Sequence, residues 1–212
     1  MVKVSSRNLL LPPPAPLERL CQSLATLDAI LCPEWQDRYY SFNSRWNSAQ
    51  HERMGSMRNG SGDEYYVLFT RHGAILKGFD HESAMAHGAP RPGMFDGIPS
   101  DFEAFLREPA FGIESTTFCL WHHGAGWNRG SAVFPSGHDP DGSEELLSIL
   151  GGDPILYQQY AHDYFEVEIP IRAIEHVYRH QPITSALLNT LNAETAVAAL
   201  SSDLDEIGYP AE

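Results

Sequence analysis

Hydrophobic residues recur at helical spacing just after the proline-rich start of the chain. Leucine or cysteine occupies positions 17, 20, 21, 24, 27 and 31, each three or four residues from a neighbour in the series. Pro16 suits the first turn of a helix, and Pro33 follows two residues after the last leucine of the series. The pattern predicts an amphipathic helix over residues 16–31. The proline-rich residues 1–16 before it are expected to form a tail that is extended rather than packed.

Alternation of apolar and polar residues begins further along the chain. Tyr40, Phe42 and Trp46 share parity within residues 39–46, with mostly Ser and Arg between them, which indicates a strand with one buried face. Residues 47–54 are polar and are expected to form a loop or one helical turn.

A β-hairpin is the clearest local prediction. Two apolar runs, residues 65–70 and 74–79, flank the short Arg71-His72-Gly73 turn. The glycine-rich residues 55–62 are expected to be a tight turn that leads into this hairpin. Two more strands are predicted at residues 116–121 and 131–134.

Glycine, proline and helical patterns dominate the rest of the chain. Residues 85–99 read as a long loop, and a short helix capped by Ser100 should follow and end before Pro109. Beyond Pro135 the pattern favours helices. We expect them at residues 144–150 (capped by Ser143), 154–165, 170–180, 185–192 and 193–200.

These elements define the expected architecture. Strands flanked and followed by helices predict an α+β fold, with an antiparallel sheet of about four to five strands, flanking helices and a C-terminal helical region. We expect one domain over residues 17–212. Its sheet-forming part should cover about residues 39–135, and its acidic helical part about residues 139–208.

Charge is distributed unevenly between these two parts. The net charge is −14; residues 1–138 carry 14 acidic and 12 basic side chains, whereas residues 139–212 carry 14 acidic and 2 basic ones. Such a field repels phosphate backbones and anionic lipids and attracts basic surfaces. We therefore expect no nucleic-acid or membrane partner, and a basic protein as the partner if the surface binds one.

Apolar runs and cysteines suggest where the protein resides. No run approaches the roughly 18 residues that cross a bilayer, and the prolines near the start would interrupt a secretory signal. The three cysteines are too few and too scattered for a disulfide framework. The sequence predicts a cytoplasmic protein.

Candidate catalytic groups gather at the ends of the hairpin. Asp63, Glu64, His72 and His81 could serve as acids, bases or metal ligands of a hydrolase. Asp63 and Glu64 are adjacent, however, so in a strand they would point to opposite faces. This alternative requires the four side chains to converge on one cavity.

Histidines and Cys119 are further candidates for a reactive or metal-binding site. Six imidazoles, with Asp80 and Glu82, could supply metal ligands, but no spacing matches a zinc pattern. The six are His72, His81, His87, His122, His123 and His138. His176 and His180 are four apart on a predicted helix, without the glutamate of a metalloprotease helix. Cys119 in an apolar strand is expected to be an inert hydrophobe. We therefore expect no metal and no other cofactor.

Three blocks, residues 39–46, 55–83 and 118–127, resemble a set of uncharacterised bacterial cytosolic proteins. In size, acidity and α+β make-up the chain is also similar to bacterial immunity proteins that neutralise toxins. This resemblance implies a protein-binding module with a basic toxin as its partner. The residues that we expect to contact the partner combine a tryptophan in a glycine-rich turn with acidic side chains of the C-terminal part: Trp127, Glu144, Glu145, Asp163 and Glu166.

Overall fold

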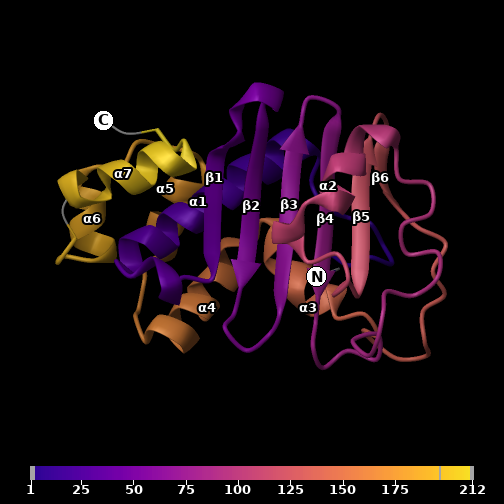
Figure 1. Ribbon diagram of the computed structural model, residues 1–212. Helices are drawn as coiled ribbons and strands as arrows, with labels where there is room; N and C mark the ends of the chain where they lie inside the picture. The colour runs from indigo at the N-terminus through magenta and orange to yellow at the C-terminus, as the bar shows by residue number, and fades with distance from the viewer. Residues whose placement is uncertain (1–2, 196, 211–212) are drawn as a thin grey trace.

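The computed structural model describes residues 3–195 and 197–210, which form a sheet covered on both faces (Figure 1). The sheet has six antiparallel strands in the order β1-β2-β3-β4-β5-β6, so each strand pairs with the next one in sequence. The strands are β1 (Tyr40–Asn47), β2 (Glu52–Arg58), β3 (Glu64–Thr70), β4 (Gly73–Phe79), β5 (Phe118–His123) and β6 (Gly126–Arg129).

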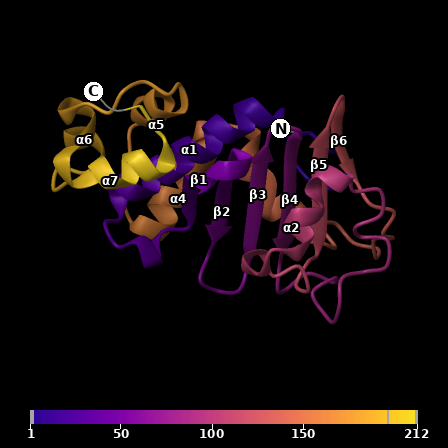
Figure 2. The same ribbon diagram turned by 45° about the horizontal axis from the view of Figure 1, so that its top comes forward.

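Helices cover the sheet unevenly. Helices α1, α4 and α5 form a layer on one face, α2 and the long loop around it cover the other face, and α6 and α7 lie beside β1 and α1 (Figure 2). The helices are α1 (Pro14–Leu31), α2 (Glu103–Arg107), α3 (Ser143–Leu147), α4 (Pro154–Phe165), α5 (Ile171–Tyr178), α6 (Ser185–Leu191) and α7 (Val197–Ile207).

Two hydrophobic cores follow from the alternation along the central strands. Val67 and Leu76 point into the core shared with α1, while Leu68 and Ile75 point into the core beneath the α2 loop. The hairpin register pairs Val67 with Leu76 and Leu68 with Ile75, so each cross-strand pair falls in one core. The predicted α+β class and the hairpin are confirmed.

The sheet is larger than predicted, with six strands where four to five were expected. The overlooked strand is β2, which lies within residues interpreted as a loop and a glycine-rich turn. Gly55 sits in its middle, between Phe42 and Val67. A Cβ there would lie 3.2 Å from the Cβ of Cys21, so glycine lets α1 approach the sheet closely. The last strand is Gly126–Arg129 instead of residues 131–134.

The common face predicted for Tyr40, Phe42 and Trp46 is wrong at its last member. The register of β1 against β2 shifts between Asn43 and Asn47. Tyr40 and Phe42 therefore lie in the core next to α1, whereas Trp46 packs in the opposite core and stacks on Phe111 at 5.5 Å.

The N-terminal segment was expected to be an unpacked tail, and this prediction is also wrong. Val4 and Leu11 are buried in the main core. The backbone N–H of Ser6 donates to the hydroxyl of Ser143 at 2.9 Å. The segment therefore belongs to the folded body, as its apolar residues before the prolines allow.

Helix ends were predicted well where proline or aspartate marks them. Asp153 caps α4 by accepting from the backbone N–H of Ile155, with Pro154 in the first turn. Ser143 does not cap α3, because its hydroxyl donates to Asp141 and Gly142 takes the cap position. Within the described ranges, none of the helices is both long and apolar enough to cross a membrane.

Candidate functional site

Asp63 and His81 meet at one end of the hairpin. Asp63 comes just before β3 and His81 just after β4, and antiparallel pairing of Glu64 with Phe79 brings these ends together. The Nδ1 atom of His81 lies 2.6 Å from Oδ1 of Asp63, and the backbone N–H of His81 donates to the same oxygen at 2.9 Å. Two of the four predicted catalytic residues are thus in contact.

Hydrogen bonds set the charge of this pair. Burial alone would raise the pKa of Asp63, but hydrogen bonds from His81 and Asn59 outweigh it and hold the pKa below its ordinary value. The hydrogen bond to Asp63 raises the pKa of His81. The pair therefore favours an ion pair, which suits binding of a charged group better than proton abstraction by a free imidazole.

Asp80 completes a group that could hold a metal ion. One ligand atom from each of Asp63, Asp80 and His81 lies within 4.8 Å of the other two. Burial, followed by the charges of Asp63 and Asp139, raises the pKa of Asp80. Two carboxylates and an imidazole are a donor set for Zn²⁺ or Mn²⁺. A metal bound through Nδ1 of His81 would have to replace the hydrogen bond to Asp63.

The other two predicted catalytic residues lie elsewhere. Glu64 accepts from the ammonium of Lys77 at 2.7 Å. His72 is in the turn at the opposite end of the hairpin, where its Nε2 lies 3.5 Å from Asp101. The structure therefore brings together Asp63 and His81 but not Glu64 or His72, and the four do not share a cavity.

The helical histidine pair and Cys119 are held in structural roles. His176 Nε2 contacts the carbonyl of Pro182, and His180 Nε2 contacts the carbonyl of Arg19, so the two imidazoles are held by different backbone groups. Cys119 is buried, and burial raises the pKa of its thiol to about 12. The thiol is protonated at neutral pH and is a poor nucleophile.

Trp127 is not an exposed anchor, contrary to the sequence prediction. Its ring is buried against His122, and its Nε1–H donates to the carbonyl of Pro12 at 2.8 Å. The glycine-rich segment around it is a tight hairpin between β5 and β6, which turns this side chain inward toward the N-terminal segment.

The four predicted acidic contact residues fall in two places. Glu144 and Glu145 lie on α3, where Glu144 is partly covered and has Lys3 at 3.4 Å. Asp163 and Glu166 are exposed at the end of α4. That end lies beside the start of β1, because Tyr164 packs on Tyr39. These acidic residues do not form a single face with Trp127.

An exposed tryptophan that was not predicted as a contact residue, Trp35, lies near the C-terminal end of α4. Trp35 is 51% exposed, and the guanidinium of Arg58 stacks over its ring at 4.6 Å. Asp203 and Glu206 of α7 line the same hollow as Trp35. Tyr164 donates to the carbonyl of Asp37 at 2.8 Å, which connects this segment to α4.

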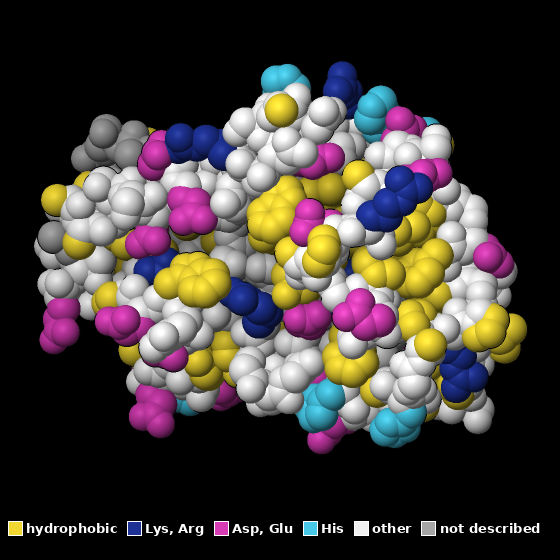
Figure 3. All heavy atoms as spheres, in the orientation of Figure 1, with side chains coloured by type: hydrophobic (Ala, Val, Ile, Leu, Met, Phe, Trp, Pro, Cys, Tyr) yellow, Lys and Arg dark blue, Asp and Glu magenta, His cyan; other side chains and the backbone are white. Residues whose placement is uncertain are grey.

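We call Trp35 with Glu34, Asp37, Asp203 and Glu206 the Trp35 face. Its four carboxylates outnumber the neighbouring guanidinium groups of Arg38 and Arg58. Arg38 is buried and bound by both oxygens of Asp203, so these two charges offset each other and leave Glu34, Asp37 and Glu206 against Arg58. Figure 3 shows acidic side chains gathered over the C-terminal helices and the start of β1, around exposed hydrophobic atoms.

Comparison of the chain with protein-family models, with curated proteins and with solved structures finds no match.

Proposed function

We propose that this protein is an acidic protein-binding module that docks a basic protein through the Trp35 face. The observation that carries the proposal is a half-exposed tryptophan set among carboxylates. Aromatic side chains that bury on binding supply much of the free energy of an interface, and surrounding charges steer the encounter.

A toxin is the partner that this proposal favours. The ground for this choice is the resemblance in type, by size, acidity and α+β make-up, to toxin-neutralising immunity proteins, and the net charge of −14 would complement a basic toxin. Neutralisation would follow if the docked module covered the toxin's active surface. The proposed contact surface therefore moves from Trp127 and the acidic pair Glu144 and Glu145 to the Trp35 face, with Asp163 and Glu166 near its edge.

Affinity capture and a matched pair of variants test this function. The immobilised protein would be exposed to lysate of its source cell at about 50 mM salt, and captured proteins identified by mass spectrometry and purified. Replacing Trp35 with alanine should weaken the purified partner's binding roughly 30-fold, as expected for loss of an aromatic hot spot. Reversing Asp37 and Glu206 to lysine should slow association and flatten its salt dependence.

Val133 and Glu103 supply the controls. Val133 is 80% exposed and Glu103 lies on α2, and neither residue belongs to the Trp35 face. Val133→Ala and Glu103→Lys should leave the affinity within about twofold of the wild type. Equal weakening by control and Trp35-face variants, or none by either, would overturn the assignment of this face.

A second candidate, a metal-dependent hydrolase, is favoured by the grouping of Asp63, Asp80 and His81. If it holds, calorimetric titration with Zn²⁺ or Mn²⁺ should give one site, and His81→Ala should weaken binding at least tenfold. His87→Ala, which changes an imidazole outside the group, is the matched control. Absence of saturable binding by the wild type would remove this candidate.

A further inference from the structure

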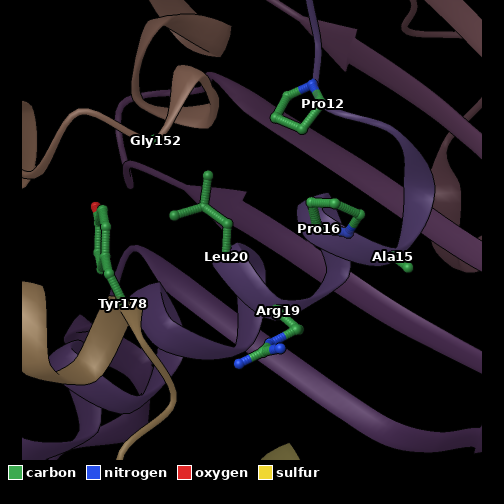
Figure 4. Close-up of a pocket in the computed structure, with 7 residues that line it drawn as sticks. All are labelled: Pro12, Ala15, Pro16, Arg19, Leu20, Gly152 and Tyr178. Atoms are coloured by element: carbon green, nitrogen blue, oxygen red, sulfur yellow. The ribbon is translucent and has the colours of Figure 1, made fainter.

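A largely apolar cavity of about 570 Å³ opens between the start of α1 and the end of α5 (Figure 4). Leu20 lies at its centre, Pro16 on one side and Tyr178 on the other, with Pro12 and Gly152 closing one end. Its volume is in the range of pockets that hold small molecules. It is separate from the Trp35 face and from the Asp63–His81 end of the hairpin.

Tyr178 carries a polar group that the fold leaves without a partner. Its hydroxyl is buried and has no hydrogen bond within residues 3–195 and 197–210. Figure 4 shows the ring along one wall of the cavity, with the hydroxyl turned toward the Gly152 end. A buried hydroxyl without a partner destabilises the protein, and phenylalanine would supply the same wall without that cost. A ligand atom at this end would give the hydroxyl its missing hydrogen bond once the ring turns slightly toward the cavity, a side-chain adjustment that is common on binding.

Arg19 gives the cavity its charge. It is the charged residue among those that line the cavity, and its side chain is exposed. Its guanidinium donates to the carbonyl of Arg179 at 3.4 Å, a long contact that leaves other N–H donors for a ligand. In a protein of net charge −14, an anion is attracted to such a local cation and repelled by most of the remaining surface.

We propose that this cavity binds a small apolar carboxylic acid that carries a second polar group. The carboxylate pairs with Arg19, the apolar body covers Leu20 and Pro16 and the ring of Tyr178, and the second polar group bonds the Tyr178 hydroxyl. Arginine binds carboxylates through two parallel N–H donors, which fixes the orientation of the acid.

Three related compounds probe the two polar contacts in the intact protein. They are 4-(4-hydroxyphenyl)butyrate, 4-phenylbutyrate without the phenol, and 4-(4-hydroxyphenyl)butan-1-ol without the carboxylate. Titration followed by NMR should show saturable binding of the first compound, with shifts at residues 12–20 and 178. Removal of either polar group should weaken binding about tenfold, the effect of one good hydrogen bond or ion pair.

Two variants separate the proposal from a structural role. Arg19→Gln should weaken the acids about tenfold and leave the alcohol unchanged. Tyr178→Phe should reduce binding of the first compound to that of 4-phenylbutyrate and keep or raise the melting temperature of the free protein. Arg172→Gln, on the exposed side of α5, is the charge-matched control. No saturable binding at millimolar concentration, or equal binding by all four proteins, would overturn the proposal.

Discussion

Replacing Asp28 with alanine is expected to lower the free energy of unfolding by about 3–5 kcal/mol. Asp28 lies on α1 with none of its surface exposed, and four donors converge on its carboxylate. The backbone N–H groups of Tyr39 and Tyr40 donate at 2.9 Å each, and the hydroxyls of Tyr157 and Tyr160 donate at 2.8 and 3.2 Å. Alanine would leave these donors buried without an acceptor and would remove the hydrogen bonds that connect α1 to the start of β1 and to α4.

Asparagine at the same position is the matched control. Its Oδ1 could accept from the Tyr39 and Tyr40 N–H groups, while its amide N–H₂ faces Tyr157, whose hydroxyl can turn to accept. The loss of stability for Asp28→Asn should therefore be less than half that for Asp28→Ala. Urea unfolding followed by circular dichroism measures both. Similar losses for the two variants would show that the shape of the site, and not its acceptors, sets the cost.

The same carboxyl group predicts a pH dependence of stability. Burial raises the pKa of Asp28 to about 7 in the folded state, against the opposing effect of the hydrogen bonds, while its ordinary value is 3.8. Between these values the folded protein binds more protons than the unfolded chain, so stability falls as pH rises from about 4 to about 7. Asparagine does not titrate, so the Asp28→Asn variant should lack this loss of stability. The free energy of unfolding of the variant should therefore rise relative to that of the wild type over that window, and the difference should stay constant above it.

The chain's local patterns predicted the elements that depend on local chemistry. The helix over residues 16–31 and the hairpin follow from residue spacing and from a glycine-containing turn, and the structure has both. Strand β2 escaped prediction because its central residue is Gly55, which has low strand propensity by itself. Only the packing of α1 against the sheet explains glycine there.

The candidate sites were predictable to different degrees. Contact between Asp63 and His81 follows from antiparallel pairing, since the start of one strand meets the end of the next. The burial of Asp28 could have been predicted from the sequence. Asp28 lies four residues after Leu24 and three before Leu31, which places it on the apolar side of the helix. A carboxylate there calls for buried donors. The exposure of Trp35 and the burial of Trp127 depend on tertiary packing, which the residues next to each tryptophan in the sequence do not predict.

Replacing Lys77 with alanine is expected to lower the free energy of unfolding by about 2–4 kcal/mol. Lys77 lies in the middle of β4 with none of its surface exposed, on the face covered by the α2 loop. Its ammonium donates to Glu64 at 2.7 Å and to the carbonyls of Ser115 and Gly112 at 3.0 and 3.4 Å. One side chain thus fastens the segment before β5 to the centre of the sheet.

The Lys77→Met variant distinguishes the contribution of the ammonium group to stability from that of the aliphatic part of the side chain. Lys77→Met keeps most of the packing volume and loses the three hydrogen bonds, so its cost should be about 1–2 kcal/mol smaller than that of Lys77→Ala. Arg107→Ala removes a guanidinium from an exposed pair with Glu103 and should change stability by less than about 0.5 kcal/mol. Urea unfolding gives all three values. Limited proteolysis should cut the Lys77→Met variant faster than the wild type within residues 108–117, because only the ammonium group contacts that segment. Equal rates of cleavage would contradict the role of Lys77 in holding the segment against the sheet.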